Sequence, residues 1–166
     1  CFAQVQLPLN VPLYQDSLNK VITSTKADSV KAEACFLLCD SWYRQDTVKA
    51  KEYLTKGKLL AAGNAYLNSI YFYFLANLSY VNSIPTAEYY YMQGDSALQN
   101  FNTPRANAYK AKNWHNYGVM QQLKDDNKKF ADILLNKSIP YAQLSGDSVY
   151  LGKCFFDLGL TFKNMG

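Results

Sequence analysis

The feature that most constrains the fold of this chain is an internal repeat of helical patterns, because repetition favours stacked units over one bundle. Each copy starts with a large aromatic residue. A large apolar residue follows three positions later, a glycine four positions later, and a fourth residue of the same helix face seven positions later. Two copies lie near the C-terminus: Trp114, Tyr117, Gly118 and Gln121, and 41 residues later Phe155, Leu158, Gly159 and Phe162. Such spacing places the residues on one helix face, where the glycine lets a neighbouring helix approach closely.

A second pattern repeats between these segments and predicts the other helix of each hairpin. It consists of a small, a large and a small residue at spacings of four and three, which lets two helices pack tightly around one large side chain. Three copies follow this pattern: Ala50, Leu54 and Gly57; Ala87, Tyr91 and Gly94; and Ala131, Leu135 and Ser138. Copies are separated by 37 to 44 residues. The two patterns together predict successive antiparallel helix pairs.

Capping residues and prolines divide the chain into about eight helices. The helices are expected at 12–25, 29–45, 47–62, 65–82, 86–101, 104–123, 127–144 and 148–165. No strand is expected, because the aromatic run from Tyr71 to Phe74 lies in a segment that is too long and too free of turn signals. Pro140 falls inside the seventh helix and predicts a kink or an early end near Ile139.

The sequence lacks the usual parts of an active site. It has one histidine, no glycine-rich phosphate loop and no nucleophile elbow, so we expect no catalysis, no metal and no cofactor in this segment. The carboxylates of Asp125 and Asp126 could form an acid–base pair, but a position before a helix favours a capping role. The net charge of +4 is spread along the chain without a basic run, which argues against nucleic acid. No apolar run reaches the roughly 18 residues that would span a bilayer.

The helix patterns resemble the tetratricopeptide repeat over about residues 31–166. Aligned first helices are Phe36, Cys39, Asp40 and Tyr43; Tyr71, Phe74, Leu75 and Leu78; and the two copies given above. Asp40 and Leu75 replace the glycine of the family pattern in the first two. The resemblance implies an all-α, right-handed superhelical stack of antiparallel hairpins. The expected repeats are 29–63, 64–102, 103–146 and an incomplete unit at 147–166.

The same resemblance implies a protein or peptide partner in a groove lined by the first helices. The groove positions carried over are Phe72, Tyr73, Ala76 and Tyr80; Lys112, His115, Asn116 and Val119; and Lys153, Phe156 and Leu160. They do not reproduce the lysine and asparagine clamp that some relatives use on carboxylate tails. Aromatic residues here could instead serve only to pack neighbouring repeats, and Phe72 could be pure packing. The groove assignment predicts that alanine at His115 or Phe156 leaves stability nearly unchanged.

The ends of the chain suggest export. Residues 1–3 resemble the end of a cleaved secretory signal, with a lipid-modified Cys1 or an arbitrary boundary as alternatives, and residues 4–28 are expected to hold a capping helix. In style the chain resembles the extracytoplasmic sensory regions of Bacteroidota-type membrane histidine kinases and related regulators. This implies a periplasmic or membrane-anchored input domain of a signalling protein, whose kinase would lie outside this segment. A cytoplasmic location, and an architectural scaffold that self-associates as a homodimer without a discrete ligand, are the alternatives.

Overall fold

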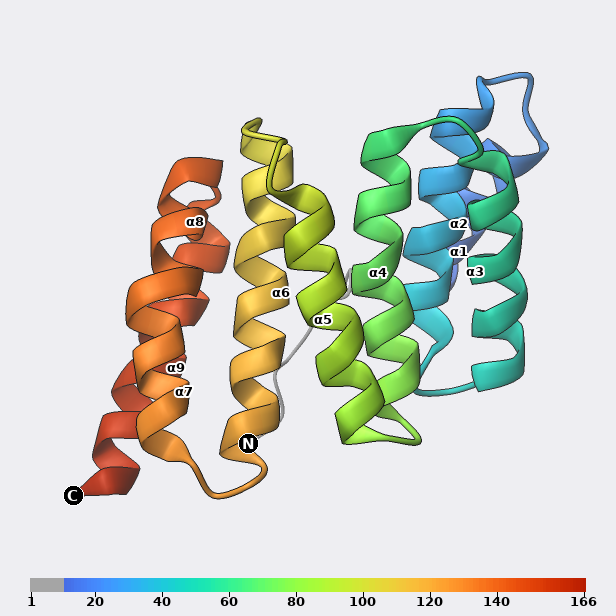
Figure 1. Ribbon diagram of the computed structural model, residues 1–166. Coiled ribbons are helices and arrows are strands. Elements are labelled where there is room, and N and C mark those ends of the chain that lie inside the picture. The colour runs from blue at the N-terminus through green and yellow to red at the C-terminus, as the bar shows by residue number, and fades with distance from the viewer. Residues whose placement is uncertain (1–10) are drawn as a thin grey trace.

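The computed structural model describes residues 11–166, and across that range the chain is helical, with no strand (Figure 1). The helices are α1 Val11–Thr23, α2 Asp28–Trp42, α3 Thr47–Leu60, α4 Ala65–Tyr80, α5 Ile84–Leu98, α6 Pro104–Gln122, α7 Asn127–Ile133, α8 Ile139–Ser145 and α9 Ser148–Met165. A π-helical turn, Leu134–Ser138, joins α7 to α8, so these two form one rod. The expected all-helical class and the eight expected helical segments are confirmed.

Polar side chains fix the starts of six helices. Each N-cap side chain accepts a hydrogen bond from the backbone N–H three residues ahead, which satisfies a donor that the helix itself leaves open. The N-caps are Asp46, Asn64, Ser83, Thr103, Asp126 and Asp147. The capping role expected near Asp125 and Asp126 is therefore confirmed for Asp126. Helix α2, expected to start at residue 29, begins at Asp28 after Ala27, which has no capping side chain.

The helices pack as a row of hairpins, each in contact with its neighbours (Figure 1). Helix α2 pairs with α3, α4 with α5, and α6 with the rod of α7 and α8, while α1 covers α2 and α9 packs on the rod. One apolar cluster runs from α2 to α6 and includes the stacked rings of Phe36 and Phe74, whose centroids lie 5.3 Å apart. A second joins α6 to α9. The core is thus distributed along the stack, with layers of apolar side chains between successive hairpins.

Glycine allows two of these layers to close. A Cβ at Gly118 would lie 2.7 Å from the ring of Phe130, and one at Gly94 would lie 2.8 Å from Nδ2 of Asn113. These distances are shorter than van der Waals contact, so a larger residue at either position would require the ring of Phe130 or the side chain of Asn113 to shift. The close approach expected at Gly118 is confirmed, whereas the one expected at Gly159 was wrong within the described residues, because an added Cβ there would meet nothing within 4 Å.

The break expected near Ile139 takes the form of the π turn. Pro140 lacks an N–H and its ring would crowd the carbonyl of Asn136 in an α-helix; a wider turn before it moves that carbonyl away. Leu134 is fully buried, whereas Leu135, expected in the core, is 45% exposed. The prediction for Leu135 was wrong because the buried side of the rod follows Phe130 and Leu134, four residues apart, and does not extend from Ala131 to Leu135.

The repeat boundaries expected after residues 63, 102 and 146 fall in the loops between α3 and α4, α5 and α6, and α8 and α9. The expectation for residues 1–3, and part of that for 4–28, lie outside the described residues. Between residues 11 and 166 no helix is long and apolar enough to cross a membrane.

Candidate partner-binding face

Three polar side chains connect the first helices of successive hairpins. Nδ2 of Asn77 on α4 donates to Oδ1 of Asp40 on α2 at 2.8 Å, and Nδ2 of Asn116 on α6 donates to Oδ1 of Asn77 at 3.1 Å. Each of the three lies thirteen residues after the N-cap of its own helix. Positions 40, 77 and 116 therefore lie level with one another across the stack.

This level corrects the alignment made from the sequence. The sequence alignment placed Asp40 opposite Leu75 and Gly118, which differs from the hydrogen-bonded level by two residues in each helix. The alignment was offset because it was based on apolar and glycine positions. These positions mark contacts between each first helix and a second helix. The contacts between first helices follow the N-caps instead.

Asp40 is a carboxylate held against an apolar layer. Burial raises its pKa, while the hydrogen bond from Asn77 and the positive charges of Lys112 and Arg44 act in the opposite direction. The hydroxyl of Tyr91 donates to Oδ1 of Asn77 at 2.7 Å, so the amide of Asn77 is occupied on both sides. Asn77 consequently joins α2, α5 and α6 through one side chain.

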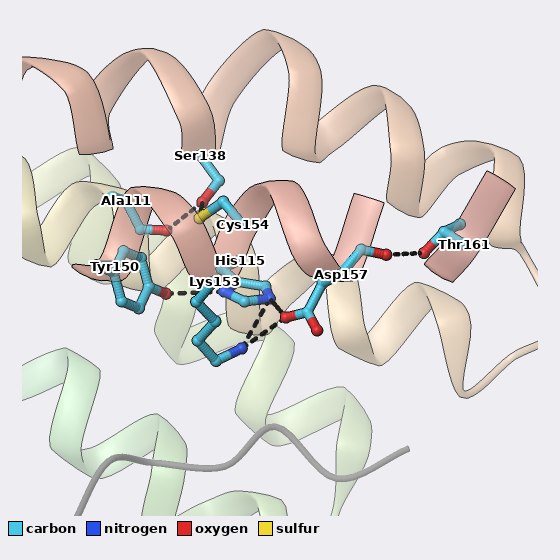
Figure 2. A network of polar contacts seen from close by, with 8 residues as sticks. All are labelled: Ala111, His115, Ser138, Tyr150, Lys153, Cys154, Asp157 and Thr161. Atoms are coloured by element: carbon cyan, nitrogen blue, oxygen red, sulfur yellow. Dashed lines mark hydrogen bonds and ion pairs between the residues drawn. The ribbon is translucent and has the colours of Figure 1, made fainter. Parts of the chain in front are cut away.

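A second polar cluster joins α6 to α9 and centres on His115, whose side chain is fully buried (Figure 2). Its Nε2 lies 2.9 Å from Oδ2 of Asp157, and its Nδ1 lies 2.9 Å from the hydroxyl of Tyr150. The ammonium of Lys153 donates to the same carboxylate oxygen at 2.6 Å. Helix α9 therefore supplies two hydrogen-bond partners to one histidine of α6, and a lysine that pairs with the carboxylate.

The geometry defines the protonation of this cluster. The Asp157 carboxylate only accepts, so Nε2 of His115 carries the proton and Nδ1 accepts from Tyr150. Burial lowers the pKa of His115; the hydrogen bond to Asp157 opposes this, and Lys153 adds to it. Burial alone would raise the pKa of Asp157, but hydrogen bonds from His115 and Lys153 outweigh it and hold that pKa below its usual value. The cluster therefore contains a neutral histidine and a carboxylate–ammonium pair.

This arrangement predicts a loss of stability on mild acidification. Because the pKa of His115 is lower in the folded chain than its ordinary 6.5, the unfolded chain binds more protons just below pH 6.5. The free energy of unfolding should then fall as pH drops from 7 to 5.5, with a slope no steeper than about 1.4 kcal/mol per pH unit for one proton. Urea unfolding at stepwise pH measures it.

A His115→Gln variant provides the control, since the chain has no other histidine. Asp40 contributes with the opposite sign, because its pKa is raised from 3.8 and the folded chain takes up that proton first. The experiment is therefore run in an Asp40→Asn background. An equal pH slope with and without His115 would contradict the assignment.

Lys112 lies between the two clusters. Its ammonium is 5.5 Å from the ring centroid of Tyr109 and 5.7 Å from that of Tyr150, and it is among the charges that act on Asp40. The groups from Asp40 to Asp157 thus extend over all four first helices. We call this set the polar row, and its members are Asp40, Asn77, Asn116, Lys112, His115, Tyr150, Lys153 and Asp157.

The structure divides the groove residues expected from the sequence into three groups. Phe156 is 67% exposed. Partly exposed are Phe72, Tyr80, Lys112, Asn116, Val119, Lys153 and Leu160. Buried are Tyr73, Ala76 and His115.

The buried group corrects the expectation of a directly accessible surface at those positions. Ala76 lies in the core, Tyr73 packs edge-on against Phe74 with centroids 5.1 Å apart, and His115 is enclosed by α9. These side chains support the face from beneath. In contrast, three of the expected groove residues are partly exposed members of the polar row: Lys112, Asn116 and Lys153.

Sequence reasoning missed Asp40, Asn77, Tyr150 and Asp157 as members of this face. One signal was present, because Asn77 interrupts the most apolar stretch of the chain and lies 37 residues after Asp40 and 39 before Asn116. No such signal marked the partners of His115 on α9. Among residues 11–166 no three His, Cys, Asp or Glu side chains are grouped as metal ligands.

Comparison with known proteins gives a likeness of fold. No protein-family model matches the chain, and no curated protein matches it in sequence. The crystal structure of BtubC (BKLC) from P. vanneervenii superposes on 92% of this chain with a TM-score of 0.61 and 18% sequence identity. At that identity the likeness concerns the helical stack alone. The chain spans 63% of the length of the BtubC chain.

Proposed function

We propose that this chain is a non-catalytic helical-repeat module of the tetratricopeptide type that holds a protein or peptide partner against the face formed by α2, α4, α6 and α9. The fold likeness to BtubC supports a helical scaffold. The polar row supports the choice of face, because it runs over all four first helices and several of its members remain partly exposed.

The charges of the row suggest how a partner lies on it. A carboxylate, Asp40, marks the α2 end, and the ammonium group of Lys112 marks the α6 end, whereas Lys153 on α9 is paired with the carboxylate of Asp157. Next to Lys153 on α9, Phe156 offers an exposed ring. An extended peptide with hydrogen-bonding backbone groups and an apolar side chain near Phe156 fits this sequence of contacts. His115 takes part by fixing α9, with both ring nitrogens engaged, so we assign it no chemical step.

The test begins with a phage-displayed library of random 12-residue peptides selected on the 166-residue chain. Selected peptides should bind Phe156→Ala and Lys112→Ala more weakly, by about 1 kcal/mol or about fivefold in Kd each, because these side chains are proposed contacts. Fluorescence anisotropy with labelled peptides measures this. The structure also predicts that Phe156→Ala keeps the thermal midpoint of the parent.

Val48→Ala is the matched control, since Val48 is an exposed apolar residue on α3, a second helix. It should bind every selected peptide as the parent does. If selected peptides depend on Val48 and ignore Phe156 and Lys112, the proposed face is wrong. If repeated selections yield no peptide, the architectural alternative without a discrete ligand takes its place.

The finer expectations from the sequence stay predictions. None of the comparisons supports the resemblance to histidine-kinase sensor regions, so the sensory role and the periplasmic location are not part of this proposal. A binding module could serve such a role, and the peptide test does not depend on it.

A further inference from the structure

An apolar line runs beside the polar row on the partner-binding face. We give this name to Tyr43, Tyr80 and Val119, each of which comes three residues after the hydrogen-bonded side chain of its own first helix. On a helix this spacing keeps a residue on the same side, one turn farther along. Tyr80 and Val119 are partly exposed, and Tyr43 is buried at the α2 end. The face therefore suits an extended peptide segment with one apolar side.

Residues 4–10 of the chain itself have this pattern, and we call them the N-terminal segment. Val5, Leu7 and Leu9 occupy every second position, with glutamine or proline between them. Such alternation places the three apolar side chains on one side of an extended chain. Pro8 disfavours helix at the residue before it, and none of the seven residues is charged. This composition favours packing on a protein surface, since tails that stay in solvent are usually rich in charge.

The N-terminal segment joins α1 at the Asp40 end of the polar row. Nε2 of Gln15 donates to Oγ of Ser41 at 3.2 Å, and Ser41 is the neighbour of Asp40 on α2. Burial raises the pKa of Tyr14, and the negative charge of Asp40 adds to this effect, so Tyr14 lies close to that carboxylate. Because α1 begins at Val11, the covalent connection brings the segment to one end of the apolar line.

The length of the segment matches the width of the face. Neighbouring helices lie about 8 to 10 Å apart, so the two steps from α2 over α4 to α6 cover about 16 to 20 Å. Seven extended residues span about 23 Å, at about 3.3 Å each. A tether this short gives the segment an effective concentration on the order of millimolar at the face, which favours it over a free peptide of equal affinity.

We infer that the N-terminal segment docks in an extended conformation along the apolar line, with its three branched side chains toward the line and its glutamines toward solvent. The segment then covers α2, α4 and α6 until an external partner displaces it. The ammonium of Lys112 makes two ring contacts and, among residues 11–166, no hydrogen bond, so it can donate to a carbonyl of the segment. This inference rests on the proposed partner-binding face and adds that a partner competes with part of the same chain.

Paramagnetic relaxation tests the docking in the full 166-residue chain. A nitroxide label is attached at Gln6→Cys, on the solvent side of the segment, in a Cys1→Ser background; the three other cysteines are buried. We expect the label to broaden the backbone amide signals of Tyr80 and Val119 and to spare that of Val48 on α3. Broadening that is confined to α1 and the adjoining end of α2 would overturn the inference.

Variants of the two sides of the segment provide the controls. Leu7→Ser together with Leu9→Ser should remove the broadening at Val119, whereas Gln4→Ser on the solvent side should preserve it. Persistent broadening at Val119 in the leucine variant would contradict the inferred orientation. Labelled chains are also mixed with isotope-enriched chains that carry no label. Equally strong broadening in the unlabelled chains would assign the contact to the segment of a second copy and overturn the inference.

Peptide affinity measures the competition. Selected peptides should bind the variant with both leucines replaced at least about threefold more tightly, because a segment that covers the face two-thirds of the time leaves about one-third of the molecules competent. Unchanged affinity would contradict the inference. If Val119 is not broadened while peptides still depend on Phe156 and Lys112, the inference fails and the proposed function stands. If the segment docks and selections yield no peptide, the inference stands and the proposed function fails.

Discussion

Replacing His115 with alanine is expected to lower the free energy of unfolding by about 3 kcal/mol or more. The side chain is fully buried, so its removal leaves a cavity between α6 and α9. It also leaves the hydroxyl of Tyr150 and the carboxylate of Asp157 each without one hydrogen-bond partner. Urea unfolding at pH 7.5, followed by circular dichroism, gives the difference.

This expectation reverses the one drawn from the sequence, which placed His115 and Phe156 together as surface contacts. Phe156→Ala is therefore the matched comparison on the helix that faces His115. It should change the free energy of unfolding by less than about 0.5 kcal/mol, as exposed positions do. Equal small effects at both positions would mean that the α6–α9 cluster does not hold α9 in place.

Replacing Asn77 with alanine is expected to cost about 2 to 4 kcal/mol, because one amide serves three partners. Without it, the carboxylate of Asp40 loses a donor in a partly buried site, and Tyr91 and Asn116 lose the oxygen that accepts from both. The same unfolding measurement applies. The exposed Asn82, in the loop after α4, provides an asparagine-to-alanine control with an effect below about 0.5 kcal/mol.

A second substitution identifies the cause of this cost. The main cause of the lost free energy of unfolding could be the charge of Asp40, left without its donor. In that case Asp40→Asn should restore part of the stability of Asn77→Ala, because a neutral amide without a partner costs less free energy than a charge. Additive losses in the double variant would show instead that the packing of Asn77 carries the effect.

The helices and their order could be predicted because their signals are local. Caps such as Asp46 and Thr103, and apolar spacings within each helix, reflect interactions between residues a few positions apart. The break before Pro140 was local too. The burial of Leu134 in place of Leu135 was not, because it depends on which side of the rod packs against α6 and α9.

The site was harder to predict, because it depends on contacts between helices. A helix pattern shows which residues share a side, but it does not show whether a later helix covers that side. His115 looks like a surface residue on α6 until α9 adds Tyr150 and Asp157. The level of Asp40, Asn77 and Asn116 likewise depends on how three first helices slide against one another, which the repeat period fixes only to within a few residues.

The hydrogen bonds through Asn77 all run in one direction. Asn116 donates to the oxygen of Asn77, and Asn77 donates to Asp40, so the two amide dipoles are aligned head to tail toward the carboxylate. Bonds aligned in series polarise one another. The charge of Asp40 on α2 therefore orients an amide two helices away, and neutralising that carboxylate would remove the charge that favours this direction.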